Sequence, residues 1–161
     1  MRRFLAAAIL FTLSCAGAYA QEPVEKKSYN YSEWTKGLFA EAVTITGLSG
    51  AKAIYLGGIG AEEEAGKPGE IRAAGDISGQ CKYTFEKIQR VLDHNGAKLT
   101  DIVKMTSYLT SPDAIGPYIG CRNEAFAAAK AELPAETLLI INRLAWPDML
   151  LEVDVDAVVA K

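Results

Sequence analysis

The segment from Leu133 to Glu152 constrains the fold most, because it joins an apolar run to an alternating strand. Leu138 to Ile141 form the longest uncharged apolar run outside the N-terminus, so we expect this run in the middle of the core. From Met149 to Val159, apolar residues alternate with polar ones, which predicts a strand with one buried face. Two carboxylates, Glu136 and Glu152, therefore lie on successive strands. The function depends largely on what these two acids can do.

The first twenty residues have the features of a secretory signal. Arg2 and Arg3 precede an uncharged, mostly apolar run, and an Ala-Tyr-Ala sequence ends at Ala20. The run is too short for a membrane span, which needs roughly 20 apolar residues. We therefore expect cleavage after Ala20, a periplasmic or secreted protein, and no membrane contact afterwards. Cys15 leaves a lipoprotein open as a weaker alternative.

The mature chain is acidic, which argues against nucleic acid as a partner. Without the leader it holds 15 basic and 20 acidic residues, a net charge of −5. Binding to a phosphate backbone depends on clustered lysines and arginines. With one histidine and no Cys-x-x-Cys pattern, we expect no metal site, and we expect no cofactor.

Two cysteines, Cys81 and Cys121, remain after cleavage. Both fall on or beside the apolar faces of expected helices, so we interpret them as free buried thiols. Export would also permit a disulfide between them.

The remaining patterns predict one α+β domain over residues 37–161, preceded by a loosely ordered arm over residues 21–36 that Trp34 anchors. The expected order is ββαβαββ, with the first two strands forming an antiparallel hairpin. This order predicts a single mixed sheet with two helices packed on one face, and self-association would cover the other face, where we place Tyr55, Tyr108 and Ile140. The expected elements are strands over 39–46 and 53–56, a helix over 76–95, a strand over 101–110, a helix over 111–131, and strands over 137–142 and 149–159.

Gly57, Gly58, Ile59 and Gly60 follow the second strand. They lack the full dinucleotide-binding pattern, and three glutamates come directly after them. The glycines instead indicate a close approach of the backbone to a ligand or a neighbouring chain.

Several of these segments together resemble the Rid family, also called YjgF, of reactive-intermediate deaminases. The resemblance is carried by Gly37-x-Phe39-x-Glu41-Ala42-Val43, Leu56-Gly57-Gly58-Ile59, Gly96-Ala97-x-Leu99-x-Asp101-Ile102-Val103-Lys104-x-Thr106, Leu133-Pro134-Ala135 and Leu151-Glu152-Val153-Asp154-Val155. It implies a chorismate-mutase-like fold, a homotrimer with ligand clefts between subunits, and hydrolysis of enamines or imines to a keto acid and ammonia.

The resemblance also implies roles for individual residues. In that family an arginine directly follows Pro-Ala and binds the substrate carboxylate, and here that position is Glu136. The acid on the last strand matches Glu152, the glycine turn matches Gly57 and Gly58, and Phe39 stands where members often have tyrosine. We expect no substitute arginine: Arg143 falls on the opposite strand face from Glu136, and Arg122 lies on a helix facing away from the cleft.

Three functions stay open at this point. The first is a homotrimer that binds a small cationic or neutral metabolite through Phe39, Gly57, Gly58, Ile59, Glu136 and Glu152, without normal 2-imino acid deamination. The second is an enamine or imine deaminase with altered charge preference, in which Glu152 and Glu136 act on the water. The third is a structural or interaction trimer.

Overall fold

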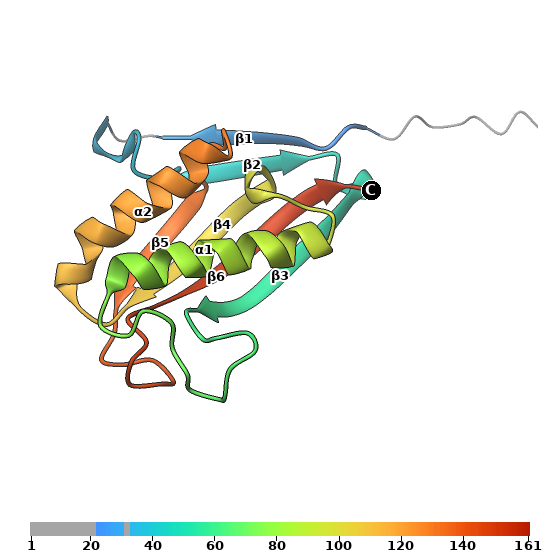
Figure 1. Ribbon diagram of the computed structural model, residues 1–161. Coiled ribbons are helices and arrows are strands. Elements are labelled where there is room, and N and C mark those ends of the chain that lie inside the picture. The colour runs from blue at the N-terminus through green and yellow to red at the C-terminus, as the bar shows by residue number, and fades with distance from the viewer. Residues whose placement is uncertain (1–21, 31–32) are drawn as a thin grey trace, which may run out of the picture.

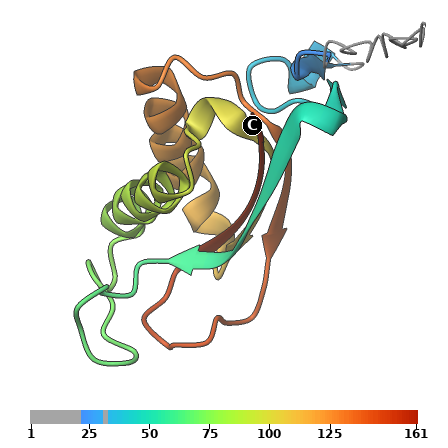
Figure 2. The ribbon, with the colours of Figure 1, turned by 90° about the vertical axis from the view of Figure 1, so that its right-hand side faces the viewer.

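The computed structural model describes residues 22–30 and 33–161. It contains a four-stranded sheet and a two-stranded sheet, with both helices on the same face of the larger sheet (Figures 1 and 2). The strands are β1 (Glu25–Tyr29), β2 (Ala42–Thr46), β3 (Ala51–Gly60), β4 (Ile102–Leu109), β5 (Ala135–Ile140) and β6 (Leu151–Ala160), and the helices are α1 (Ile77–His94) and α2 (Ile115–Ala128). The expected α+β class is confirmed.

The larger sheet has the order β3-β6-β4-β5 and is mixed. β6 is antiparallel to both of its neighbours, whereas β4 and β5 are parallel, because α2 carries the chain back across the sheet between them. The core lies between this sheet and the helices, and β6 alternates through it as predicted. Leu151, Val153 and Val155 are fully buried on the helix side.

Local signals set the ends of the helices. The Asp76 side chain accepts a hydrogen bond from the Ser78 backbone N–H at 3.0 Å, which caps α1. Gly96 ends that helix in the left-handed region at φ +73°, a conformation that costs glycine little. Ser111 caps the short 3₁₀ turn Pro112–Ala114 that leads into α2.

The pairing of the N-terminal strands differs from the prediction. β2 pairs with β1 in a separate sheet and not with β3, so the expected hairpin does not form. The segment 25–29, expected to be loosely ordered, is a strand whose Lys26 amine donates to the backbone carbonyls of Thr100 and Ile102. Trp34, expected to anchor the arm, is 68% exposed. Hydrophobic alternation does not specify which neighbour a strand pairs with.

The apolar run 138–141 is not in the middle of the core. It belongs to β5, an edge strand, and Leu139 and Ile140 are both exposed. Ile140 pairs with Leu109, which points toward the helices, so Leu139 and not Ile140 shares the outer face with Tyr108. Tyr55, on the same outer face, is 78% exposed. This apolar outer surface is what the sequence predicted another chain would cover.

Cys81 and Cys121 form a disulfide that joins α1 to α2, with their Cα atoms 6.4 Å apart. The expectation of free thiols was therefore wrong. Two inward-facing cysteines on packed helices lie within bonding distance whenever the helices cross close to them, and sequence periodicity does not show where helices cross.

The three consecutive glutamates after the glycine turn are all paired with basic side chains. Their ion pairs are Glu62 with Lys87, Glu63 with Arg72, and Glu64 with Arg90. The pairs with Lys87 and Arg90 hold the loop after β3 against α1, whereas the pair with Arg72 joins two parts of that loop. Across the described part of the chain, no helix has the length and apolar character to cross a membrane.

Candidate ligand-binding site

A cavity of about 380 Å³ opens between β5, α2 and the turn that precedes β2. Its walls are mainly apolar: Trp34, Leu38, Phe39, Ile115, Ile119 and Leu138. The charged residues that line it are Arg122 and Glu136. The structure thus brings together two residues that the sequence nominated, Phe39 and Glu136, and adds an arginine that the sequence analysis had excluded.

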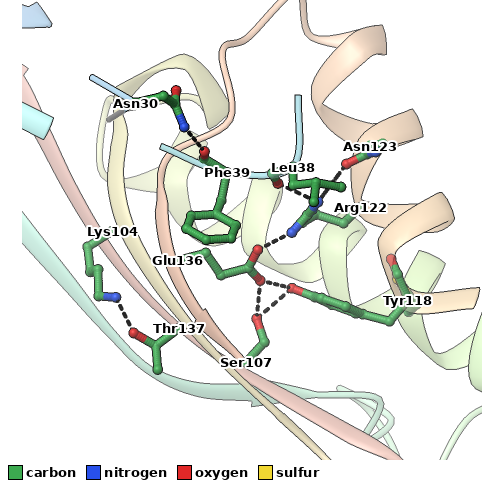
Figure 3. A network of polar contacts seen from close by, with 11 residues as sticks. Asn30, Leu38, Phe39, Lys104, Ser107, Tyr118, Arg122, Asn123, Glu136 and Thr137 are labelled. Carbon is green, nitrogen blue, oxygen red and sulfur yellow. Dashed lines mark hydrogen bonds and ion pairs between the residues drawn. The ribbon is translucent and has the colours of Figure 1, made fainter. Parts of the chain in front are cut away.

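Arg122 comes from the buried stripe of α2. Tyr118, Arg122 and Phe126 follow one another at four-residue spacing, and all three are almost fully buried. The Arg122 guanidinium donates to the Glu136 carboxylate, to the Leu38 carbonyl oxygen at 2.8 Å and to Asn123 Oδ1 at 2.8 Å (Figure 3). The prediction that Arg122 faces away from this site was wrong, because α2 lies directly over the β5 edge of the sheet. A basic residue within an apolar helical stripe was the signal that could have found this pair.

Glu136 completes the network from the strand side. It pairs with Met105 of β4, whose side chain is in the core, so its carboxylate points toward the helices. Glu136 Oε1 accepts hydrogen bonds from Ser107 Oγ at 2.7 Å and from the Tyr118 hydroxyl at 2.6 Å (Figure 3). Burial, and then the charge of Glu136, raise the pKa of Tyr118 well above its ordinary value, so this phenol remains a donor.

The ion pair between Arg122 and Glu136 is closed to solvent. Each side chain is 3% exposed, and the two charges cancel. Arg122 and Glu136 together form the floor of the cavity. Because their charges cancel, this floor is neutral, and its polar groups are already hydrogen-bonded within the protein.

The other predicted acid, Glu152, lies at the glycine turn. β3 has a bulge between Leu56 and Ile59 where it pairs with β6. A Cβ on Gly58 would lie 2.0 Å from Glu152 Oε1, whereas a Cβ on Gly57 would meet nothing within 4 Å. Gly58 therefore makes room for the carboxyl of Glu152, and Ile59 packs against the core.

Burial raises the pKa of Glu152, and the nearby charges of Glu62 and Asp154 raise it further. Asp154 accepts a hydrogen bond from the Tyr108 hydroxyl at 3.0 Å on the same outer face. Among residues 22–30 and 33–161, no group of three or more His, Cys, Asp or Glu side chains could hold a metal ion.

The two predicted acids lie on opposite faces of the sheet. Glu136 contacts Ser107 on the helix side, whereas Glu152 pairs with Tyr108, the next residue of β4, on the outer side. Successive residues of a strand point to opposite faces. Within one chain, Glu136 and Glu152 therefore do not share a cavity.

Known structures share this fold. A Rid-family protein of unknown function from Yersinia pestis, YyfB, aligns over 83% of this chain and 98% of its own, with a TM-score of 0.70 and 21% identity. Escherichia coli TdcF with bound serine aligns over 77% of this chain and 90% of its own, with a TM-score of 0.61 and 21% identity. At this level of identity, these two likenesses show the fold alone.

Sequence comparison identifies the family. A RutC family protein of Pyrococcus abyssi is 35% identical over 86 residues, which are 53% of this chain, and one of Pyrococcus horikoshii is 32% identical over 88 residues, which are 55% of it. These matches span 64% and 66% of the two relatives, a little under two thirds of each. The family model described as Endoribonuclease L-PSP matches residues 36–159. This chain therefore belongs to that family, which is the Rid/YjgF family its sequence resembles.

Proposed function

We propose that this protein is an exported Rid-family trimer that binds a small metabolite and does not deaminate 2-imino acids. One observation carries the proposal. Glu136 occupies the position where the family resemblance implies a carboxylate-binding arginine, and it forms a buried ion pair with Arg122. A substrate carboxylate would meet a residue of its own charge at this position.

Arg122 does not replace the missing arginine, although it lines the same cavity. Its guanidinium is held by Glu136, Leu38 and Asn123. Drawing it toward a substrate would leave the carboxylate of Glu136 buried without its cation, which costs about 3–5 kcal/mol. At about 1.4 kcal/mol per factor of ten, substrate affinity would fall by roughly 10² to 4 × 10³.

The opposite placement of the two acids supports assembly. The resemblance implies that Glu152 and the residue after Pro-Ala serve one cleft, and in this fold only a second chain could bring them together. The exposed Tyr55 and Leu139 on the outer sheet face offer an apolar surface for that contact. Light scattering should give a mass near three mature chains, and a mass near one chain would remove the support for shared clefts.

The disulfide supports export. Disulfides persist in oxidising compartments and are rare in the cytosol, and the leader-like N-terminus points to the same destination. Fractionation of cells that express the full chain should place it outside the cytoplasm, with Gln21 as its first residue. A cytoplasmic protein that starts at Met1 would contradict this part of the proposal.

The deciding assay measures ammonia release from freshly generated 2-iminopropionate. The mature protein should match the rate without enzyme, and turnover comparable to that of an arginine-bearing family member would overturn the proposal. The informative gain-of-function variant is Arg122→Met/Glu136→Arg, because Glu136→Arg alone would place two buried guanidinium groups together. Its matched control is Arg122→Met/Glu136→Met, which should remain inactive.

A further inference from the structure

We propose that the cavity between β5 and α2 binds an uncharged, two-ring aromatic molecule that packs against Trp34. The inference rests on the proposed function, in which this cavity is the ligand site, and it specifies the chemical class of the ligand. Three properties of the cavity carry it: its neutral floor, its apolar walls and the aromatic pair at its entrance.

The floor that a single chain provides selects against ions of either sign. A free carboxylate would compete with Glu136 for Arg122, and a free ammonium would compete with Arg122 for Glu136. Ser107 and Tyr118 already donate to the Glu136 carboxylate, and these hydrogen bonds help to hold it in place beside Arg122. A neutral ligand leaves all of these bonds in place.

The walls and the volume favour a flat apolar body. Six apolar side chains surround about 380 Å³ of space, whereas an apolar cavity of about 150 Å³ accepts one benzene ring. Two fused rings therefore fit with room for a small substituent. Leu38 and Leu138, with Ile115 and Ile119 of α2, provide aliphatic surfaces for the faces of such a ring system.

The entrance contains two aromatic rings. Trp34 and Phe39 meet edge to face, with ring centroids 5.8 Å apart and planes at 74°. Trp34 is 68% exposed and lines the cavity, so much of its ring surface is available for contact with a ligand. The tyrosine that family members often have at position 39 is here a phenylalanine, which removes a polar group from the same entrance.

The test uses two probes of equal shape and different charge, 2-naphthamide and 2-naphthoate, titrated calorimetrically into the full mature protein. The amide should bind at least about ten-fold more tightly than the carboxylate, since only the carboxylate must break the ion pair. Glu136→Gln removes the competing charge and releases the Arg122 guanidinium, so it should raise 2-naphthoate affinity by about ten-fold and reduce the preference for the amide. Equal or tighter binding of 2-naphthoate to the wild-type protein would overturn the inference.

Two tryptophan variants test whether the probe binds in this cavity. Trp34→Ala should weaken 2-naphthamide binding by roughly ten-fold, because aromatic contacts add to the buried area. Trp146→Ala, which removes a tryptophan packed on Gly69 away from the cavity, should leave binding unchanged. If neither probe binds the wild-type protein, as would occur if a neighbouring chain fills the cavity, the inference fails.

These outcomes are distinct from a failure of the proposed function. Ammonia release from 2-iminopropionate would overturn the loss of deamination whatever the naphthalene probes do. Absence of both ammonia release and probe binding would overturn the ligand class alone.

Discussion

Removing one partner of the buried ion pair should destabilise the protein far more than removing both. In Arg122→Met, the Glu136 carboxylate stays 97% out of solvent without its cation, at a cost of about 3–5 kcal/mol in the free energy of unfolding. At about 4 °C per kcal/mol for a domain of this size, Tm should fall by roughly 12–20 °C.

In Arg122→Met/Glu136→Met, no charge is left behind, and Ser107 and Tyr118 keep a hydrogen bond to each other. Replacing a buried ion pair by apolar side chains of similar volume is often neutral or stabilising, so the double variant should recover most of the loss. The measurement is urea unfolding of the oxidised mature protein, followed by circular dichroism.

The matched control is an exposed ion pair of the same chemistry. Arg90 and Glu64 lie 2.6 Å apart with both side chains nearly half exposed, so Arg90→Met should cost less than about 1 kcal/mol. If Arg122→Met costs no more than Arg90→Met, then water or another group screens Glu136, and the closed pair cannot explain a loss of carboxylate binding.

Three further predictions concern the disulfide and the outer face of the sheet. Replacing both Cys81 and Cys121 by alanine should cost about 4 kcal/mol, because the bond joins residues 40 apart in sequence, and an unchanged urea midpoint would mean that the bond does not constrain the unfolded chain. Glu152 has a raised pKa in the fold, so its ionisation costs stability as pH rises above the ordinary value of 4.5. Glu152→Gln should therefore raise the urea midpoint at pH 7 and lose this advantage below pH 4.5, and an advantage that persists in acid would contradict a raised pKa of Glu152. Gly57→Ala should stabilise the protein by about 0.4–1 kcal/mol, whereas Gly58→Ala should gain less because its Cβ must displace the Glu152 carboxyl; equal gains would place that carboxyl elsewhere.

The parts of the fold that the sequence predicts are those controlled by neighbouring residues. The ends of the helix expected over 76–95 and the alternation of β6 depend on contacts within a few positions, and both appear where the pattern placed them. The same patterns predicted the order ββαβαββ, and the family resemblance implied a chorismate-mutase-like arrangement of these elements.

The errors concern contacts between distant segments. The run 138–141 is as apolar as a central strand, and only the strand order shows that β5 lies at the edge of the sheet. The pairing of β2 with β1, and the bond between Cys81 and Cys121, likewise depend on which surfaces meet in space. Such choices are set by the packing of the whole domain, and no local pattern contains them.

At the site, too, local patterns identified single residues and missed contacts between distant segments, except that a local pattern could have identified Arg122. Glu136 was singled out because it stands in the place of an arginine, and its position in the cavity follows from the strand pairing. Arg122 was dismissed on the direction of its helix, yet its own stripe argued for burial. A guanidinium between Tyr118 and Phe126 requires an anion, and in the described chain that anion is Glu136, fourteen residues later.

The charges of Arg122 and Glu136 therefore depend on each other, and neither is favourable in the buried site without the other. A carboxylate after Pro-Ala, alone, would be buried without a cation, and an arginine on the inner stripe of α2, alone, would be buried without an anion, which is also costly. Together they keep the cavity neutral and lined mainly by apolar side chains. The Arg122 guanidinium, which could otherwise bind a carboxylate, is held by Glu136. A family member with an acid after Pro-Ala should for this reason carry a basic residue on the same turn of its second helix. One that lacks this residue must leave the acid exposed to solvent, and its cavity would then favour a cation over a neutral ligand.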